Sequence, residues 1–291
     1  MKKALVFGGT RFFGIHLVKG LLEKGFKVTV ATRGNVEDPF GNDVNRVQVD
    51  RTDKQGLAYA FKNETWDVIY DQICFSPLDA LHSIETFRGK TYKYVMTSSL
   101  SVYDMETASV PVKEEDFDPY NEKLVIAGGE ELSYQEGKRQ AEAVFFQKAP
   151  FPVTAVRFPI VLGENDYTGR LASYIKKVKY NQGIYLGNRQ AAMNFIAEQE
   201  AGRFLAWLSR QHIDGPINAC ANGAITLEKL MEQIGDTTGS RVSYSSLDSD
   251  SPFNIPETWT MSNEKASSHG YSFSNLFEWL PELIRSVEKD V

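Results

Sequence analysis

A glycine-rich turn lies between the first apolar segment of the chain and the helical pattern that follows it. Ala4–Phe7 is a continuous apolar run, and the turn Gly8–Gly14 reads Gly-Gly-Thr-Arg-Phe-Phe-Gly. Gly8 permits a tight turn, Gly14 lets a helix pack closely on the strand, and the free amides at the helix start attract phosphate. Because a strand precedes it and a helix follows, the turn predicts a Rossmann domain that holds a dinucleotide pyrophosphate. A purely structural turn is the alternative.

Further short apolar segments alternate with helical ones through the first half of the chain. The expected strands are Lys27–Thr32, Arg46–Val49, Asp67–Ile73, Tyr92–Thr97, Val153–Val156 and Ile217–Cys220. Alternating strands and helices form βαβ units and therefore a doubly wound parallel sheet. We predict an α/β fold with a Rossmann domain over residues 1–160, rejoined by about residues 196–221. Residues 161–195 and 222–291 are expected to form a smaller, discontinuous α+β substrate lobe.

Helix signals in the second half of the chain are more widely spaced. The segment 197–209 is strongly helical and is expected to return to the Rossmann core. Thr226 can cap a helix that runs to about Ile234, and Ser274 can cap another through Trp279. Pro281 suits the first turn of a final helix.

Charge and composition exclude several classes of function. The net charge is −6, and an acidic chain is a poor generic ligand for nucleic acid or anionic membranes. No apolar run reaches the roughly 18 residues of a membrane span, and the N-terminal run is too short for a signal peptide. Cys74 and Cys220 lie in apolar runs and are expected to be buried thiols, and no metal-ligand pattern occurs. We therefore expect a cytoplasmic protein without a metal, a membrane or a nucleic-acid partner.

The end of the second strand bears on which dinucleotide is bound. An NAD site usually has Asp or Glu there for the ribose 2′-OH, whereas this chain has Thr32 and Arg33. Arg33 could pair with the 2′-phosphate of NADP, and Arg11 could reach the same group. Asp50 could accept a hydrogen bond from the adenine amine or merely cap a loop. We predict NADP as the cofactor, with NAD as the alternative. The expected cofactor-binding residues are Gly8, Thr10, Arg11, Phe12, Phe13, Gly14, Thr32, Arg33, Asp50, Arg51, Gln72, Lys138, Phe158 and Pro159.

A tyrosine and a lysine four residues apart open the helix before the Val153–Val156 strand. This spacing places Tyr134 and Lys138 on one helical face. A nearby ammonium favours the phenolate, whose reference pKa near 10 is otherwise too high for acid–base work at neutral pH. Lys138 could also bind the nicotinamide ribose while Tyr134 exchanges a proton with a substrate carbonyl or hydroxyl. The alternative is a surface lysine beside a packed tyrosine.

Together these motifs resemble the extended short-chain dehydrogenase/reductase family, which includes nucleotide-sugar epimerases and dehydratases. The resemblance implies that the family's catalytic hydroxyl, four residues before the Tyr of Val102-Tyr103, is Ser99, with Ser98 and Ser101 as neighbours. The segments Arg157–Gly163 and Met193–Ile196 resemble later landmarks of the family. It also implies a small-molecule substrate and a homodimer.

Some residues depart from the family pattern. Arg11 stands where most members have glycine, which resembles an atypical branch that includes chloroplast stem-loop RNA-associated proteins. Asn194 replaces the usual Asp and Met193 a frequent Arg. We predict hydride transfer on a sugar nucleotide or similar polar substrate. The alternatives are a reductase of a smaller ketone or aldehyde, and a regulatory or RNA-associated protein that keeps the nucleotide-binding fold.

Overall fold

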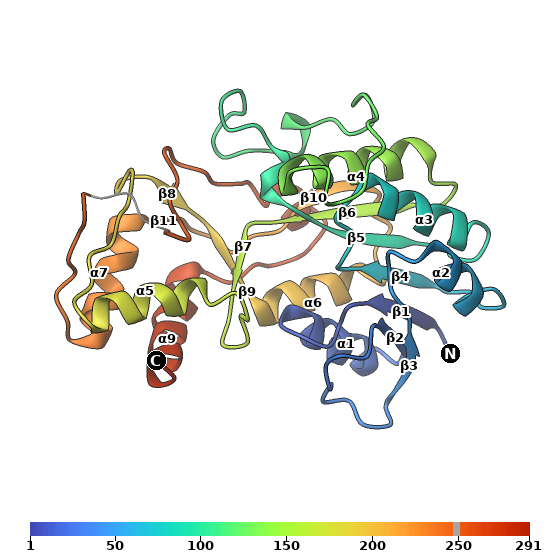
Figure 1. Ribbon diagram of the computed structural model, residues 1–291, viewed down its shortest axis with the longest axis horizontal. Coiled ribbons are helices and arrows are strands. Elements are labelled where there is room, and N and C mark those ends of the chain that lie inside the picture. The colour runs from blue at the N-terminus through green and yellow to red at the C-terminus, as the bar shows by residue number, and fades with distance from the viewer. Residues whose placement is uncertain (247–250) are drawn as a thin grey trace.

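A seven-stranded parallel sheet forms the centre of the larger part of the molecule (Figure 1). The computed structural model describes residues 1–246 and 251–291. The strands of this sheet are β1 (Lys3–Phe7), β2 (Lys27–Thr32), β3 (Val44–Gln48), β4 (Val68–Asp71), β5 (Tyr94–Ser99), β6 (Val153–Phe158) and β10 (Gly215–Asn218). Their order is β10-β6-β5-β4-β1-β2-β3, and every neighbouring pair is parallel. The predicted doubly wound sheet is thereby confirmed.

Helices cover both faces of this sheet, which explains why its strands are apolar on both sides. Helices α1 (Phe13–Glu23) and α6 (Glu198–Leu208) cover one face, and α2 (Lys54–Ala60), α3 (Pro77–Phe87) and α4 (Tyr134–Lys148) cover the other (Figure 1). Side chains alternate along β1 accordingly. Val6 packs with the α1 and α6 layer, whereas Leu5 and Phe7 pack with α3 and α4.

The strand boundaries differ from the sequence expectation by a few residues. Strand β4 is Val68–Asp71 rather than 67–73, and beyond it the Asp71 carboxylate accepts a hydrogen bond from the Ile73 amide at 3.2 Å. Strand β6 continues to Phe158 because its partner β5 continues to Ser99. Apolar periodicity locates a strand but does not show where its hydrogen-bonding partner ends.

A second group of elements packs around its own apolar core (Figure 1). It contains α5 (Arg170–Lys179), α7 (Leu227–Thr238), α9 (Leu276–Lys289) and the short antiparallel pair β8 (Ala192–Met193) and β11 (Ile225–Thr226). Strands β7 (Ile160–Leu162) and β9 (Phe195–Ala197) run parallel between this group and the large sheet. The short helix α8 (Glu264–Ser268) lies beside β10.

The C-terminal helix corrects one expectation. Residues 276–289 form one helix with Pro281 inside it, not two helices. An internal proline costs about 3 kcal/mol. The buried stripe of Leu276, Leu280 and Ile284 in the lobe core holds the helix together nonetheless. Ser274 is not the cap because its hydroxyl donates to Glu200, and Asn275 accepts from the Phe277 amide instead.

The cap of α7 was identified correctly. Thr226 accepts a hydrogen bond from the Lys229 amide, 3.2 Å away. The helix continues beyond Ile234 to Thr238 and ends at Gly239, whose φ is 64°. Glycine adopts this left-handed conformation without the penalty that a side chain brings.

Helices α1 and α6 approach each other closely at Gly202. A Cβ atom there would lie 2.7 Å from both the Leu17 nitrogen and the Phe13 oxygen, which belong to the α1 backbone. We expect Gly202→Ala to lower the free energy of unfolding by about 1–3 kcal/mol, because α1 must move away. Urea denaturation measures this change. Gly128→Ala is the control because its Cβ would meet only the flexible Glu131 carboxylate, so an equal loss in both variants would contradict the close contact.

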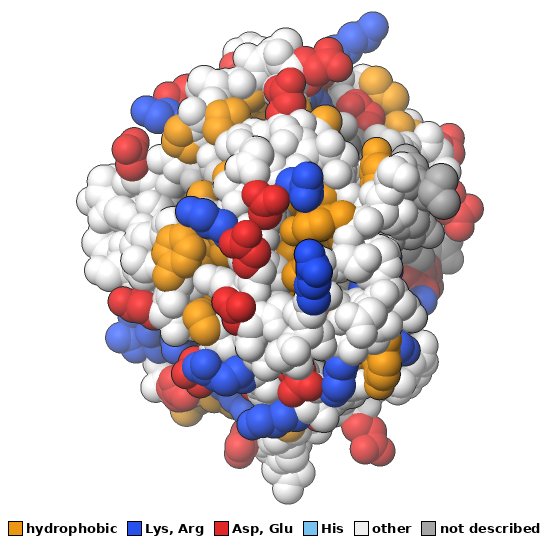
Figure 2. Space-filling view, turned by 90° about the vertical axis from the view of Figure 1, so that its left-hand side faces the viewer, with side chains coloured by type: hydrophobic (Ala, Val, Ile, Leu, Met, Phe, Trp, Pro, Cys, Tyr) orange, Lys and Arg blue, Asp and Glu red, His pale blue; other side chains and the backbone are white. Residues whose placement is uncertain are grey.

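The outer face of the lobe carries mixed charges. Lysine and arginine side chains are interspersed with aspartate and glutamate on this face, with small separate apolar patches between them (Figure 2). A field of one sign is therefore not present on the described part of this face, and such a field is what attracts a phosphate backbone. Within the described residues, the model contains no helix with the length and apolarity that crossing a membrane requires.

Candidate active site

The predicted site residues gather at the carboxyl edge of the sheet, where open α/β sheets bind ligands. Strands β1 and β4 are neighbours at the point where the strand order reverses. The glycine turn follows β1, Gln72 follows β4, and Ser99 ends β5. Tyr134 begins α4, which packs on α3 and against the turn that follows β5.

The glycine turn has the shape of a phosphate cradle. Gly8 and Gly9 have φ angles of 86° and 90°. A Cβ atom at Gly14 would lie 2.7 Å from the Gly9 Cα, so a side chain cannot be placed there. Phe12 precedes α1 with a φ of 51°, a conformation that non-glycine residues rarely adopt. Such strain often marks a ligand-binding turn. The Gly14 and Ile15 amides of α1 donate to the Arg11 and Phe12 carbonyl oxygens at 3.0 and 3.1 Å. A phosphate at this helix start would therefore bind through the amides that precede Gly14 and the positive end of the helix dipole.

The surroundings of the Gln72 side chain show whether this turn fits a dinucleotide. Its side-chain oxygen lies 2.7 Å from the position that a Gly14 Cβ would take. Its buried Nε2 has no hydrogen-bond partner among the described residues. A buried amide donor without an acceptor is costly unless a ligand supplies one. The turn and Gln72 therefore fit a bound NAD or NADP.

The ends of β2 and β3 form the other part of the predicted cofactor site. Arg33 is exposed, and Thr32 accepts a hydrogen bond from the Gly34 amide. Asp50 accepts from the amide and the hydroxyl of Thr52 at 2.9 and 2.8 Å. These bonds to Thr52, and attraction to Arg33, lower the pKa of Asp50. One Asp50 oxygen thus caps its own loop, as the alternative interpretation expected, and the other stays open to a ligand.

The Arg51 side chain points into the protein rather than toward the sheet edge. It is 4% exposed, pairs with Asp71, and donates to Ser83 at 3.0 Å. Tyr94 donates to the same Asp71 at 2.6 Å. Burial lowers the pKa of the Arg51 guanidinium, but attraction to Asp71 and the other acidic groups around it together outweighs this effect, and the net shift is upward. Any contact of residue 51 with a cofactor therefore falls to its backbone.

Tyr134 and Lys138 lie on one face of α4 but in different environments. The Tyr134 side chain is exposed, whereas Lys138 is 1% exposed. The Lys138 ammonium donates at 2.8 Å to the carbonyl oxygens of Cys74 and Thr97, and it lies 5.9 Å from the Tyr134 ring centroid. Ser133 caps the helix by accepting from the Glu136 amide. These two carbonyl oxygens, one in the loop after β4 and one in β5, hold the ammonium beside an exposed phenol.

Phe75 is a neighbour of this pair that the sequence did not reveal. Its ring centroid lies 4.4 Å from the Lys138 ammonium and 6.3 Å from the Tyr134 ring. A Cβ at Gly137 would lie 2.4 Å from the Phe75 carbonyl oxygen, so the glycine permits this close approach of α4. Phe75 directly follows Cys74 after β4, a position with no recognisable sequence signal.

Ser99 lies at the end of β5 and is half-buried. Its oxygen accepts from the Ser101 amide at 3.1 Å and caps the turn Leu100–Val102. Because a hydroxyl that accepts a hydrogen bond still has its own proton to donate, this contact leaves Ser99 able to bind a substrate oxygen. The neighbouring Ser98 is buried and donates to Glu142 instead.

A buried ion pair lies below these residues. Glu142 and Arg157 are fully buried, and their closest N–O distance is 2.7 Å. Arg157 also donates to the Tyr103 hydroxyl and to the carbonyl oxygens of Glu114 and Phe117. Burial lowers the pKa of the Arg157 guanidinium. The charge and hydrogen bonds of Glu142 and Tyr103 raise this pKa by more, so the guanidinium stays charged. Glu142 follows Lys138 by four residues on the same helix face, and its pair connects α4, β6 and the segment 103–117.

Three of the remaining predicted residues, Phe12, Phe13 and Phe158, form an aromatic contact between the glycine turn and β6. The Phe13 ring lies 5.4 Å from Phe12 and 5.8 Å from Phe158, and Pro159 is buried beside Phe158. Thr10 is half-buried and Arg11 is exposed. The Arg11 guanidinium lies 5.7 Å from the centroid of Tyr167, whose ring also contacts Phe12. Tyr167 is a second neighbour that sequence reasoning missed.

Asn194, in the family-like segment Met193–Ile196, has a structural role. Asn194 donates to the Met261 carbonyl at 2.9 Å and accepts from the Met261 amide at 3.3 Å. An aspartate could not donate to this carbonyl, which explains the amide at this position.

Cys74 and Cys220 are buried free thiols. Burial raises the pKa of Cys74 to about 12.

The family assignment comes from comparison with known proteins. Residues 4–220 match the model of the NAD dependent epimerase/dehydratase family. Chloroplast stem-loop binding protein of 41 kDa b from Arabidopsis thaliana is 26% identical over 251 residues. This alignment covers 76% of the present chain and 62% of the plant protein, so the chain spans less than two thirds of that relative.

Solved structures share the fold. An epimerase from Methanothermobacter thermautotrophicus has a TM-score of 0.79 at 17% identity, covering 99% of this chain and 92% of that one. The dTDP-glucose 4,6-dehydratase of Bacillus anthracis in complex with NAD has a TM-score of 0.78 at 16% identity, covering 100% and 97%. With the glycine turn, the sheet order and the match over residues 4–220, the chain belongs to the NAD-dependent epimerase/dehydratase family.

Proposed function

We propose that this chain transfers a hydride between NAD(P) and a sugar nucleotide or a similar polar substrate, with Tyr134 as the acid–base residue. The observation that carries the proposal is the exposed Tyr134 phenol beside the buried Lys138 ammonium at the carboxyl edge of the sheet. The names of structural relatives, which include UDP-glucose 4-epimerase from Thermotoga maritima, support this substrate class.

The chain's own residues would divide the work as follows. Ser99 donates a hydrogen bond to the substrate oxygen, and Tyr134 takes or returns the proton on that oxygen. Lys138 places a positive charge 5.9 Å from the Tyr134 ring centroid. The glycine turn and Gln72 would hold the pyrophosphate, and a bound nicotinamide would supply hydride exchange at the substrate carbon. Oxidation, epimerisation and dehydration can all begin with this step.

The division of the chain and its assembly are also proposals. We assign residues 1–160 and 196–221 to the cofactor domain, and residues 161–195 and 222–291 to the substrate lobe. The separate apolar cores of the two regions support this division. The family resemblance further implies a homodimer, which sedimentation analysis would detect.

We propose NADP rather than NAD as the preferred cofactor, because exposed Arg33 directly follows β2, where a carboxylate would favour NAD. We expect Arg33→Ser to weaken NADP binding about tenfold or more, the loss of one charged hydrogen bond, and to leave NAD binding unchanged. Isothermal titration with both cofactors measures this. The control is Arg88→Ser, an exposed arginine at the end of α3. Tighter binding of NAD than of NADP by the unmodified chain would contradict the proposal.

The decisive experiment for the proposed function measures hydride exchange directly. The purified chain is incubated with each nicotinamide cofactor and a panel of UDP- and dTDP-sugars and simple carbonyl compounds. Absorbance at the reduced nicotinamide band reports net redox chemistry, and chromatography of the sugar nucleotides reports epimerised or dehydrated products. Transfer of deuterium from labelled sugar carbons to the nicotinamide reports transient oxidation. We expect turnover with at least one sugar nucleotide. Turnover of simple ketones alone would overturn the substrate class. Cofactor binding without any hydride exchange would favour the regulatory, RNA-associated alternative.

A further inference from the structure

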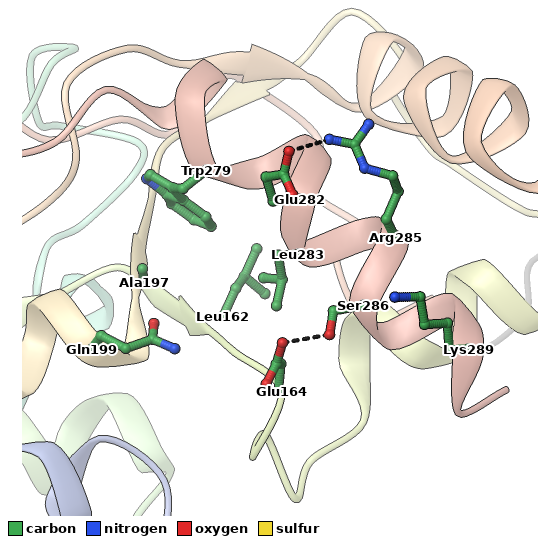
Figure 3. A pocket seen from close by; sticks show the side chains of 10 residues that line it. All are labelled: Leu162, Glu164, Ala197, Gln199, Trp279, Glu282, Leu283, Arg285, Ser286 and Lys289. Atoms are coloured by element: carbon green, nitrogen blue, oxygen red, sulfur yellow. Dashed lines mark hydrogen bonds and ion pairs between the residues drawn. The ribbon is translucent and has the colours of Figure 1, made fainter.

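A cavity of about 420 Å³ lies between α9 and the segments that connect the lobe to the large sheet (Figure 3). Its walls include Leu162 at the end of β7, Gln199 in α6, and Trp279, Leu283 and Lys289 on α9. None of the residues predicted to bind the cofactor or to act in catalysis lines it. The volume falls in the range of small-molecule sites, about 300–1,000 Å³.

One side of this cavity is apolar. The edge of the Trp279 ring points toward Leu162 and Leu283 (Figure 3). The Trp279 and Leu283 side chains are half-buried, and both pack against the lobe core. A flat apolar group placed here would contact all three side chains. Its transfer out of water would be the main source of its affinity for the cavity.

The polar side chains of the cavity differ in whether they are already paired. Glu164 is hydrogen-bonded to Ser286, and Glu282 pairs with Arg285 (Figure 3). Lys289 and Gln199 make no hydrogen bond or ion pair with any residue that the structure describes. The Glu282 charge is thus paired, whereas Glu164 keeps its negative charge while it accepts from Ser286. The Lys289 ammonium and the Gln199 amide remain available to a ligand. Lys289 is therefore the group of this cavity at which the anionic part of a ligand would bind.

We propose that the cavity binds a small organic anion with a flat apolar body, its negative group on Lys289 and its body against Trp279, Leu162 and Leu283. Because the cavity lies between the lobe and the start of α6, such a ligand contacts both parts of the molecule at once. A second polar contact comes from the Gln199 amide.

The segment 163–169 connects this cavity to the glycine turn. Glu164 lies in the cavity wall, and Asn165 donates to the fully buried Glu198 at 2.9 Å. Two residues further, the Tyr167 ring packs against Arg11 and Phe12. A ligand that packs on Leu162 therefore restricts the segment that begins directly after it, whose Tyr167 ring contacts the glycine turn. We expect the ligand and the cofactor to strengthen each other's binding, as linkage requires. This coupling rests on the proposed cofactor site, whereas binding in the cavity does not.

The binding test uses 1-anilinonaphthalene-8-sulfonate, an aromatic anion that fluoresces when it leaves water. The full chain is titrated with the dye in the presence of saturating NADP⁺, which keeps the dye out of the cofactor site. We expect saturable binding of one dye per chain, weakened about tenfold by Lys289→Glu, the effect of one charged contact. Leu283→Asp should weaken it similarly. Lys176→Glu, an exposed lysine on neighbouring α5, is the control. Equal dye affinity in all variants, or no saturable binding, would overturn the proposal.

The coupling test measures the NADP⁺ dissociation constant with and without saturating dye. We expect about fivefold tighter NADP⁺ binding with the dye, a modest value for linked sites. Tyr167→Ala should remove this difference while the dye still binds. An unchanged dissociation constant would overturn the coupling and leave the cavity site standing. A chain that binds the dye through Lys289 but binds no nicotinamide cofactor would instead overturn the proposed function.

Discussion

Tyr134→Phe is expected to reduce the rate of hydride exchange about 10²- to 10⁴-fold, the usual contribution of a positioned acid–base group. The substitution removes only the phenolic oxygen. The ring remains 6.3 Å from Phe75, and the Lys138 ammonium keeps its bonds to Cys74 and Thr97. Because the Tyr134 side chain is exposed, stability should not change. Steady-state kinetics should show a lower kcat, and titration should show an unchanged cofactor dissociation constant.

A second tyrosine provides a matched control for this experiment. Tyr59 on α2 is also exposed, and the Lys62 ammonium lies 4.7 Å from its ring centroid. It therefore has the same side-chain pairing without a place at the carboxyl edge of the sheet. Tyr59→Phe should leave kcat unchanged. If Tyr134→Phe retained full activity, another group would have to move the proton, and the assignment of Tyr134 would be wrong.

Glu142→Gln is expected to lower the free energy of unfolding by about 3–5 kcal/mol, the cost of leaving one charge of a buried pair without its partner. Arg157 would keep its contacts to Tyr103 and to two carbonyl oxygens but would lose the only opposite charge it contacts among the described residues. Urea denaturation followed by circular dichroism measures the change. An unchanged m-value would show that the unfolding reaction itself is the same.

The double variant Glu142→Leu/Arg157→Met separates charge from packing. Replacing both charges with apolar side chains is often close to neutral. Here the double variant should regain only part of the stability that Glu142→Gln loses, because the Glu114 and Phe117 carbonyl oxygens lose their hydrogen-bond donor. The control is Glu64→Gln at the exposed Lys3–Glu64 pair, where we expect a change below about 1 kcal/mol. A loss in Glu142→Gln no larger than in this control would contradict the buried-pair argument.

Local sequence signals predicted much of the fold and part of the candidate site. The glycine turn, the alternation of strands and helices and the Thr226 cap are patterns of neighbouring residues, and the structure shows each of them. The spacing of Tyr134 and Lys138 also predicted a shared helix face. Pro281 was misread because its local preference for a first helical turn was outweighed by burial of a stripe that continues on both sides of it.

The tertiary structure decided which side chains surround these groups. Phe75 lies 4.4 Å from Lys138, and Arg157 pairs with Glu142, although neither contact has a signal in the chain. The same holds for Arg51, which could face a ligand or Asp71 until the positions of β3 and β4 are known. Periodicity and caps act between residues a few positions apart, so the sequence by itself determined the elements and their order. Contacts between distant residues depend on how those elements pack, and only the folded structure reveals them.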